Sequence, residues 1–270
     1  MSTVAAALAA ARAKLPAAEA RLLLAHTLER PTAWLIAHDD EVLAEASLRR
    51  FAALVARRAG GEPVAYLTGR REFFGRDFAV SAAVLIPRPE TELLVDIALA
   101  RLAAGDRILD LGTGSGCIAI TLALESPRAR VSAVDASPAA LELARGNADR
   151  LGARVRFVRS DWFTSVEGER FELIVANPPY IATADPHLAS GDLRHEPIAA
   201  LASGTDGLDA IRNIAATAPD HLTPGGRLWL EHGYDQAPAV QALLAAAGLA
   251  DIEQHPDLAG IIRVSGGRLP

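Results

Sequence analysis

The sequence predicts an α/β protein in which a parallel, doubly wound sheet follows a small N-terminal helical-bundle domain. Beyond Pro89, short apolar runs alternate repeatedly with helical stretches, the pattern of strands joined by helices that cover both faces of one sheet. Residues 1–62 carry helical periodicity and no strand signal. A glycine-rich turn follows the first apolar run, at the edge of the sheet where such folds bind ligands.

The helical domain is expected over residues 1–62. Pro16 and Pro31 suit the first turns of helices. Between residues 44 and 58, apolar side chains recur at helical spacing and most arginines fall outside that stripe. A Gly-Gly pair and Pro63 end the last segment. We expect this domain to recognise the substrate, because no catalytic motif lies in it.

A β-hairpin is expected in the linker over residues 63–88. Short β-prone runs from residue 66 to residue 86 surround Gly69 and Gly75, and such runs separated by glycines are typical of hairpins. The third part, residues 89–270, then holds the sheet.

Alternating patterns define the elements of residues 89–270. Strands are expected at 107–111, 131–135, 155–158, 172–176 and 227–231, and helices at 90–103, after Gly116, and at 138–151, 207–218 and 237–247. The tail from Ala250 to Val264 has weak periodicity and could supply a closing β-hairpin.

Composition excludes several classes of protein. The chain has 270 residues, of which 50% are hydrophobic and 22% charged, so it is globular rather than disordered or fibrous. A net charge of −6 argues against a protein that binds long stretches of nucleic-acid backbone, and we expect no direct nucleic-acid binding. The single cysteine allows no internal disulfide, no Cys/His cluster has zinc spacing, and no long uncharged apolar run occurs. We expect a cytoplasmic protein with no metal and no membrane contact.

The glycine-rich turn Gly112-Thr113-Gly114-Ser115-Gly116 follows the first predicted strand and precedes a helix. Glycines let the backbone approach a ligand closely while helix N–H groups face it. The turn also fits the G-x-G-x-x-A dinucleotide pattern, so NAD and S-adenosylmethionine both remain open here, as does a turn without a ligand.

Two aspartates flank that turn. Asp135 ends the second predicted strand, where its carboxylate could accept both hydroxyls of an adenosine ribose or could cap the helix that begins at Pro138. Asp110, just before the turn, would repel a pyrophosphate but attract an ammonium group. Because S-adenosylmethionine carries an ammonium group, Asp110 favours it over NAD. The alternative for Asp110 is a cap of the turn or helix.

Asn177-Pro178-Pro179-Tyr180 directly follows the fourth predicted strand, at the ligand edge of the sheet. The two prolines stiffen the loop and leave carbonyl groups free, and Asn177 adds a side-chain carbonyl. Tyr180 offers a flat face. The loop is therefore interpreted as a receptor for a planar amide or amino nitrogen, although the same four residues could form an ordinary turn.

Taken in chain order, these motifs resemble a class I S-adenosylmethionine-dependent methyltransferase acting on planar nitrogen. More narrowly, the chain resembles the bacterial peptide-chain release factor glutamine methyltransferases over nearly its full length. The segments that carry the resemblance are Leu22-Leu23-Leu24-Ala25-His26, Trp34-Leu35, Pro63-Val64-Ala65-Tyr66-Leu67, Gly69, Phe73-Phe74-Gly75, Ile86-Pro87-Arg88-Pro89-Glu90-Thr91-Glu92, the glycine turn with Asp110 and Leu111, Asp135, Asp161-Trp162-Phe163, Asn177-Pro178-Pro179-Tyr180 and Glu231-His232-Gly233.

The resemblance implies N5-methylation of the glutamine in the Gly-Gly-Gln motif of class I peptide-chain release factors, with S-adenosylmethionine as cofactor. It implies that Asn177, Pro178 and Tyr180 are catalytic, that the loop with Pro179 binds substrate, and that Asn177 also touches the cofactor. The implied cofactor-binding residues are Asp110, Gly112, Thr113, Gly114, Ser115, Gly116, Asp135, Trp162 and Asn177.

Five further residues can be interpreted either as functional or as structural. Trp162 either borders the adenine, as in the family, or packs in the core. Arg88 and Glu90 either shape the mouth of the site or belong to a helix start at the adjacent proline. His232 is interpreted as structural, and Cys117 as a packing residue rather than a nucleophile.

Several rival functions stay open. The planar nitrogen could instead be adenine N6 in DNA, guanine N2 in ribosomal RNA or a glutamine of a ribosomal protein. DNA is disfavoured by the net charge and the single compact extra domain. From other classes, the chain could be an NAD-dependent dehydrogenase, for which we find no hydride-transfer residues, or a non-catalytic module that binds an adenosine ligand.

Overall fold

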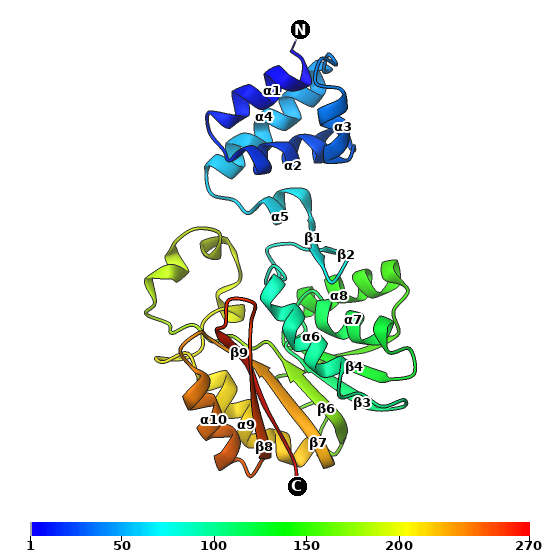
Figure 1. Ribbon diagram of the computed structural model, residues 1–270, viewed down its shortest axis with the longest axis vertical. Coiled ribbons are helices and arrows are strands. Elements are labelled where there is room, and N and C mark those ends of the chain that lie inside the picture. The colour runs from blue at the N-terminus through cyan, green and yellow to red at the C-terminus, as the bar shows by residue number, and fades with distance from the viewer. Residues whose placement is uncertain (1) are drawn as a thin grey trace. The chain divides into compact units, whose positions relative to one another are not determined.

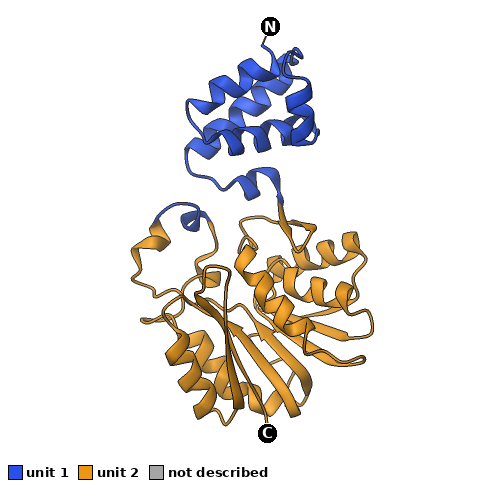
Figure 2. Ribbon diagram, in the orientation of Figure 1, with its two compact units in different colours: residues 1–70, 190–195 blue, residues 71–189, 196–270 orange. Residues whose placement is uncertain are grey.

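The computed structural model describes residues 2–270 (Figure 1). They form two compact units (Figure 2). The helical unit contains the chain up to Arg70 together with Ser190–His195, and the sheet unit contains Arg71–Ala189 and Glu196–Pro270. The helical unit therefore extends past the expected boundary at residue 62 and takes in a short segment from much later in the chain.

The helical unit has a hydrophobic core of its own, as the periodicity predicts. Phe51 and Val55 on the fourth helix are buried in it, while the arginines of that helix lie outside. Pro16 and Pro31 stand one residue before their helices rather than inside the first turn. The five helices are α1 (Val4–Arg12), α2 (Ala17–Leu28), α3 (Thr32–Ala37), α4 (Glu45–Ala59) and α5 (Val64–Thr68).

Helix α5 corrects the expected start of the β-prone linker. Pro63 precedes it, and Gly69 ends it with a φ of 69°, a left-handed conformation that suits glycine at a helix end. The hairpin itself is confirmed: β1 (Arg70–Phe73) and β2 (Arg76–Ala79) pair around Phe74 and Gly75. One turn of helix is too short to show a helical period in the sequence, so its residues are not distinguished from the β-prone runs that follow.

The sheet unit contains seven strands in the order β5-β4-β3-β6-β7-β9-β8. β3 to β7 are parallel, as expected, and β9 runs antiparallel to both β7 and β8, which confirms the closing hairpin. The strands are β3 (Arg107–Leu111), β4 (Arg130–Asp135), β5 (Val155–Arg159), β6 (Phe171–Ala176), β7 (Leu222–Glu231), β8 (Ala250–Pro256) and β9 (Ile262–Arg268).

Helices cover both faces of this sheet (Figure 1). Neighbouring strand residues point to opposite faces, so Ile108 joins the core beneath one helix group and Leu109 joins the other. Within residues 2–270, no helix is long and apolar enough to cross a membrane. One face carries α6 (Glu92–Leu99), α7 (Cys117–Glu125) and α8 (Pro138–Leu151), and the other carries α9 (Asp209–His221) and α10 (Ala237–Ala246).

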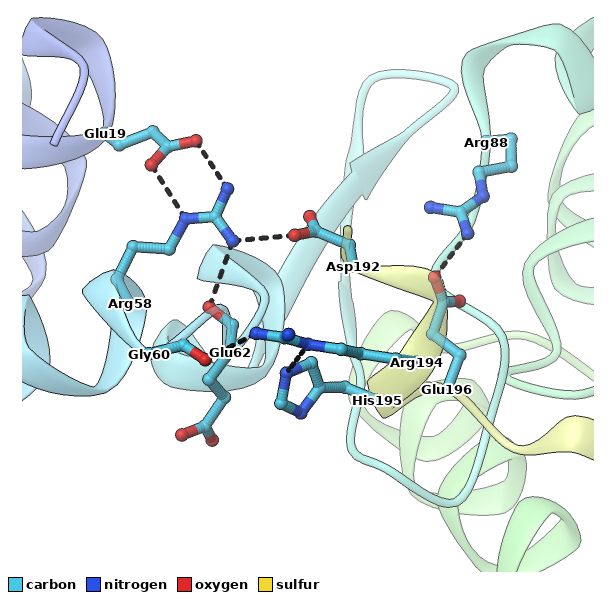
Figure 3. Close-up of polar contacts among 9 residues, drawn as sticks. All are labelled: Glu19, Arg58, Gly60, Glu62, Arg88, Asp192, Arg194, His195 and Glu196. Atoms are coloured by element: carbon cyan, nitrogen blue, oxygen red, sulfur yellow. Dashed lines mark hydrogen bonds and ion pairs between the residues drawn. The ribbon is translucent and has the colours of Figure 1, made fainter. Parts of the chain in front are cut away.

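A long connection between β6 and α9 holds three short 3-10 helices and supplies the late segment of the helical unit. Within that unit, Arg58 Nη1 donates to Asp192 Oδ1 across 2.6 Å, and Arg194 Nη2 donates to the Gly60 carbonyl across 2.5 Å (Figure 3). The 3-10 helices are η2 (Pro186–Ala189), η3 (Leu193–His195) and η4 (Ile198–Ala200), and a fourth, η1 (Pro89–Thr91), precedes α6.

Candidate active site

A cavity of about 420 Å³ lies at the carboxyl ends of β3, β4 and β6. β4 and β6 flank β3 on opposite sides, so this is the point where the winding of the sheet reverses and where such folds bind ligands. Each of the three strands contributes the residues that follow or end it: Gly112 after β3, Asp135 at the end of β4 and Asn177 after β6. All lining residues belong to the sheet unit.

The glycine turn forms one wall of the cavity. Gly112 has a φ of 70°, and a Cβ placed there would lie 3.6 Å from the Trp162 ring. Gly116 is different, because its Cβ would lie 2.8 Å from Ile120 and it does not line the cavity. Its Cβ would also lie 3.1 Å from Ala144, so Gly116 suits the close packing between α7 and α8. Gly112, Thr113, Gly114 and Ser115 line the cavity.

Asp110 lies fully buried and is not among the residues lining the cavity. Its Oδ2 accepts from the Thr113 hydroxyl across 2.6 Å, while its Oδ1 is buried without a partner. Burial raises the pKa of Asp110 to about 7. Asp110 thus supports the turn from beneath, and its attraction for an ammonium group stays a prediction.

Asp135 lines the cavity and holds the turn in place. Its Oδ2 accepts from the Gly114 N–H across 2.9 Å, and its Oδ1 accepts from the Ser137 N–H across 2.8 Å. Each carboxylate oxygen retains a lone pair, so two hydroxyls could still bind. The side-chain cap of α8 is Ser137, whose hydroxyl accepts from Ala140 N, rather than Asp135.

Asn177, Pro178 and Pro179 line the cavity, and Tyr180 does not. The Asn177 amide donates through Nδ2 to the Thr91 hydroxyl across 3.0 Å, which leaves its Oδ1 buried without a partner. Tyr180 packs against the core instead, and its hydroxyl points at Glu231 Oε1, 3.4 Å away. Burial raises the pKa of Tyr180. The Tyr180 ring therefore packs away from the cavity and does not offer its flat face to a ligand there.

Trp162 lies where the core meets the cavity, and its place beside an adenine stays a prediction. Its side chain is half-buried and packs against the core, yet it also lines the cavity beside Gly112. Its φ of 47° lies in the left-handed region, which is uncommon for a residue with a side chain and occurs at ligand sites that the surrounding structure holds in place.

Arg88 lines the cavity as well. Pro89 begins η1, as predicted for a helix start at this proline. The Arg88 guanidinium pairs with the buried carboxylate of Glu196 (Figure 3), which also accepts from Ile86 N across 2.9 Å. Sequence reasoning missed Glu196, because nothing in its neighbourhood distinguishes it from a surface carboxylate.

Thr91 and Glu231 lie in segments that carry the resemblance, but nothing in their sequence pattern indicates a role for either residue. His232 and Cys117, which the sequence indicates are structural, are both buried. His232 is buried between the Gly233 carbonyl and the Ser265 hydroxyl, and burial raises the pKa of Cys117 to about 12. Across residues 2–270, no cluster of His, Cys, Asp or Glu could hold a metal ion.

The acceptor groups at the cavity fit a ligand that carries hydroxyls and a cationic end. Two buried polar atoms on residues that line the cavity, Ser115 Oγ and Asn177 Oδ1, have no hydrogen-bond partner. Unpartnered buried polar atoms are costly unless a ligand satisfies them. Asp135 adds a carboxylate with free lone pairs. Such a set suits a ribose and an amino acid moiety.

Comparison with known proteins decides the family. The chain is 56% identical to the release factor glutamine methyltransferase of Burkholderia pseudomallei, over 95% of this chain and 93% of that protein. It belongs to the release factor glutamine methyltransferase family. The protein of that name from Bordetella pertussis is 54% identical, over 94% of this chain and 96% of its own length.

Two domain families match separate parts of the chain. Residues 1–69 match the PrmC N-terminal domain and residues 89–194 match the methyltransferase small domain. A methyltransferase from Pyrococcus furiosus superposes with a TM-score of 0.56 at 21% identity, over 79% of this chain and 95% of that one. That similarity shows the fold, and the family match confirms the resemblance inferred from the motifs.

Proposed function

We propose that this enzyme transfers a methyl group from S-adenosylmethionine to the side-chain amide nitrogen (N5) of the glutamine in the Gly-Gly-Gln motif of class I peptide-chain release factors. The observation that carries the proposal is the unpartnered Oδ1 of Asn177 on the wall of the cavity, next to Pro178. An acceptor in that position suits an NH₂ group. The two relatives described above are both named release factor glutamine methyltransferase, and that name supplies the acceptor class.

The residues that would hold the cofactor are those of the glycine turn, Asp135 and Trp162. Asp135 would accept the ribose hydroxyls, and Trp162 would border the adenine. Asp110 would place negative charge beneath the amino acid end. When bound, S-adenosylmethionine would supply the methyl group: the N–C bond would form as the S–C bond breaks, the bonding pair would stay on sulfur, and the nitrogen would release one proton to solvent water.

Asn177 and Pro178 would position the amide nitrogen. An amide nitrogen is a weak nucleophile because its lone pair is delocalised, so orientation matters more than prior ionisation. Asn177 Oδ1 and the Pro178 carbonyl can accept its two hydrogens. As the nitrogen gains positive charge, both acceptors bind it more strongly, which is the differential stabilisation that lowers the barrier. We assign no general base.

The helical unit would orient the release factor, since no cavity residue lies in it. An acceptor protein of this kind and a lone cysteine both suit a cytoplasmic enzyme.

The decisive experiment incubates the enzyme with S-adenosylmethionine and a class I release factor and locates added mass by peptide mapping. One methyl group on the Gly-Gly-Gln glutamine is expected. A release factor left unmodified, while a ribosomal protein supplied in a parallel reaction is methylated on glutamine, would contradict the proposed acceptor. Calorimetric titration with S-adenosylhomocysteine and NAD tests the cofactor, because only the first should bind.

A further inference from the structure

Three polar side chains from separate segments meet beside the methyl-acceptor position. Asn177 follows β6, Glu231 ends β7 and Thr91 ends η1. β6 and β7 are parallel with Ala176 paired to Leu230, so the register places the next residues, Asn177 and Glu231, side by side. Thr91 and Glu231 are both buried, and Thr91 and Asn177 line the cavity.

Each of these side chains has one hydrogen-bonding group left over. The Thr91 oxygen accepts from Asn177 Nδ2, so the Thr91 proton needs another acceptor. Glu231 Oε2 is buried without a partner, and the Thr91 hydroxyl lies close enough to lower the pKa of Glu231 as a donor. A chain of donors from Asn177 through Thr91 to Glu231 would use both groups and would leave Asn177 Oδ1 free for a ligand.

We propose that Thr91 and Glu231 are positioning residues that set the orientation of the Asn177 amide. Glu231 accepts a hydrogen bond from the Thr91 hydroxyl, Thr91 therefore accepts from Nδ2, and Asn177 can present only its carbonyl oxygen to the substrate amide. Without this chain the two ends of the Asn177 amide are interchangeable in shape, and an NH₂ end would repel the NH₂ group of glutamine. The inference rests on the proposed function.

The direction of the chain depends on the charge of Glu231. An ionised carboxylate only accepts, whereas a protonated one can donate to Thr91. Thr91 would then donate to Asn177, and the amide would turn its oxygen inward. The groups that face Glu231 are Thr91 and Glu90 from η1, Tyr180 after β6, Cys117 on α7 and Arg263 on β9.

These neighbours shift the pKa of Glu231 in opposite directions. Burial raises the pKa of Glu231 to about 7, and Glu90 raises it further, while the Thr91 and Tyr180 hydroxyls and Arg263 lower it. The ionised form, and with it the productive amide orientation, is thus gained as pH rises through about 7. Methyl transfer should fall on the acid side of that range.

Thr91→Val keeps the shape of the side chain and removes the hydroxyl, and Thr91→Ser keeps the hydroxyl. We expect Thr91→Val to lower kcat at least about tenfold with little change in the Kd for S-adenosylhomocysteine, and Thr91→Ser to recover most of kcat. The control is Thr121→Val, a buried threonine on α7 whose hydroxyl has no partner. A wild-type kcat in Thr91→Val would overturn the inference.

Nuclear magnetic resonance reads the amide orientation without turnover. The chain has three asparagines, Asn147, Asn177 and Asn213, so ¹⁵N-asparagine labelling yields few side-chain signals, and Asn177→Asp identifies the signal of Asn177. We expect that signal to titrate near pH 7, to shift in Thr91→Val, and to lose its titration in Glu231→Gln. An Asn177 signal unaffected by both substitutions would overturn the inference.

These measurements separate the two proposals. If the wild-type enzyme leaves the release factor unmodified, the proposed function fails, and the Asn177 signal still tests the hydrogen-bonded chain. If the wild-type enzyme methylates it and Thr91→Val does so equally fast, only the positioning role fails.

Discussion

Arg58 and Asp192 form an ion pair of 2.6 Å although 134 positions separate them in the chain. The same guanidinium binds both oxygens of Glu19, at 2.7 and 2.9 Å (Figure 3). A planar guanidinium suits this arrangement because it donates in two directions at once. The pair holds Ser190–His195, a segment of the connection that follows the Asn177 loop, within the helical unit.

Replacing Arg58 with alanine should release that segment. We expect faster amide hydrogen exchange at residues 190–195 and a loss of about 1 kcal/mol in the free energy of unfolding, because the Arg58 side chain is only 18% exposed but its partners are partly solvated. Arg49→Ala is the control on the same helix, since Arg49 is 67% exposed in its pair with Glu45. Unchanged exchange at 190–195 would contradict the role of Arg58.

Asp135→Ala should weaken binding of S-adenosylhomocysteine by about 2 to 4 kcal/mol in calorimetric titration, since a charged acceptor for two hydroxyls is lost. The substitution also removes the acceptor of the Gly114 and Ser137 N–H groups, so a thermal melt must accompany it. Asp149→Ala, on the exposed side of α8, is the control. Wild-type affinity in folded Asp135→Ala would exclude the ribose assignment.

Asn177→Ala should lower methyl transfer at least about a hundredfold while largely retaining cofactor affinity, because one of two acceptors for the substrate amide is lost. Asn177→Asp keeps an acceptor in nearly the same place and should recover part of the rate. Single-turnover transfer of labelled methyl at saturating cofactor measures both. A wild-type rate in the alanine variant would show that the acceptor nitrogen binds elsewhere.

Asp110 should make stability depend on pH. Burial raises its pKa from 3.8 to about 7, so between these values the folded protein holds a proton that the unfolded chain has released. The free energy of unfolding therefore falls as pH rises from about 4 to about 7. In urea unfolding, Asp110→Asn should flatten this dependence and be more stable by about 1 to 3 kcal/mol near pH 8.

Glu231 has the same sign of dependence, so a smaller slope should remain in Asp110→Asn. If the free energy of unfolding depends on pH equally in the wild type and in Asp110→Asn, the raised pKa of Asp110 is contradicted. The same variant should bind S-adenosylhomocysteine more weakly, because the negative charge beneath the turn is gone.

Ile36, which is 74% exposed on α3, tests whether the helical unit contacts the release factor. We expect Ile36→Glu to raise KM for the intact release factor about fivefold and to leave KM for a short Gly-Gly-Gln peptide unchanged. Leu258→Glu, at a fully exposed position in the sheet unit, is the control. Equal effects on both substrates would argue against recognition through this face.

Elements whose apolar pattern stands out locally could be predicted with their bounds. The strand at 107–111 and the helix at 138–151 have the expected bounds, because apolar runs and helical periods are local properties of the chain. The helix at Val64–Thr68 was missed, and β7 begins five residues before the expected start at Arg227, at Leu222. Short elements and strand ends depend on packing partners that no local pattern records.

The sequence by itself determined the family, the alternation of strands and helices, and the motifs that would share one edge of the sheet. Chain order sufficed for the last point, because the carboxyl ends of parallel strands meet at the same edge. Only the tertiary structure decided that Asp110 lies beneath the turn, that Tyr180 faces Glu231, and that Thr91 binds Asn177. Those relationships depend on burial and strand register, which bring distant side chains together without leaving a local signal.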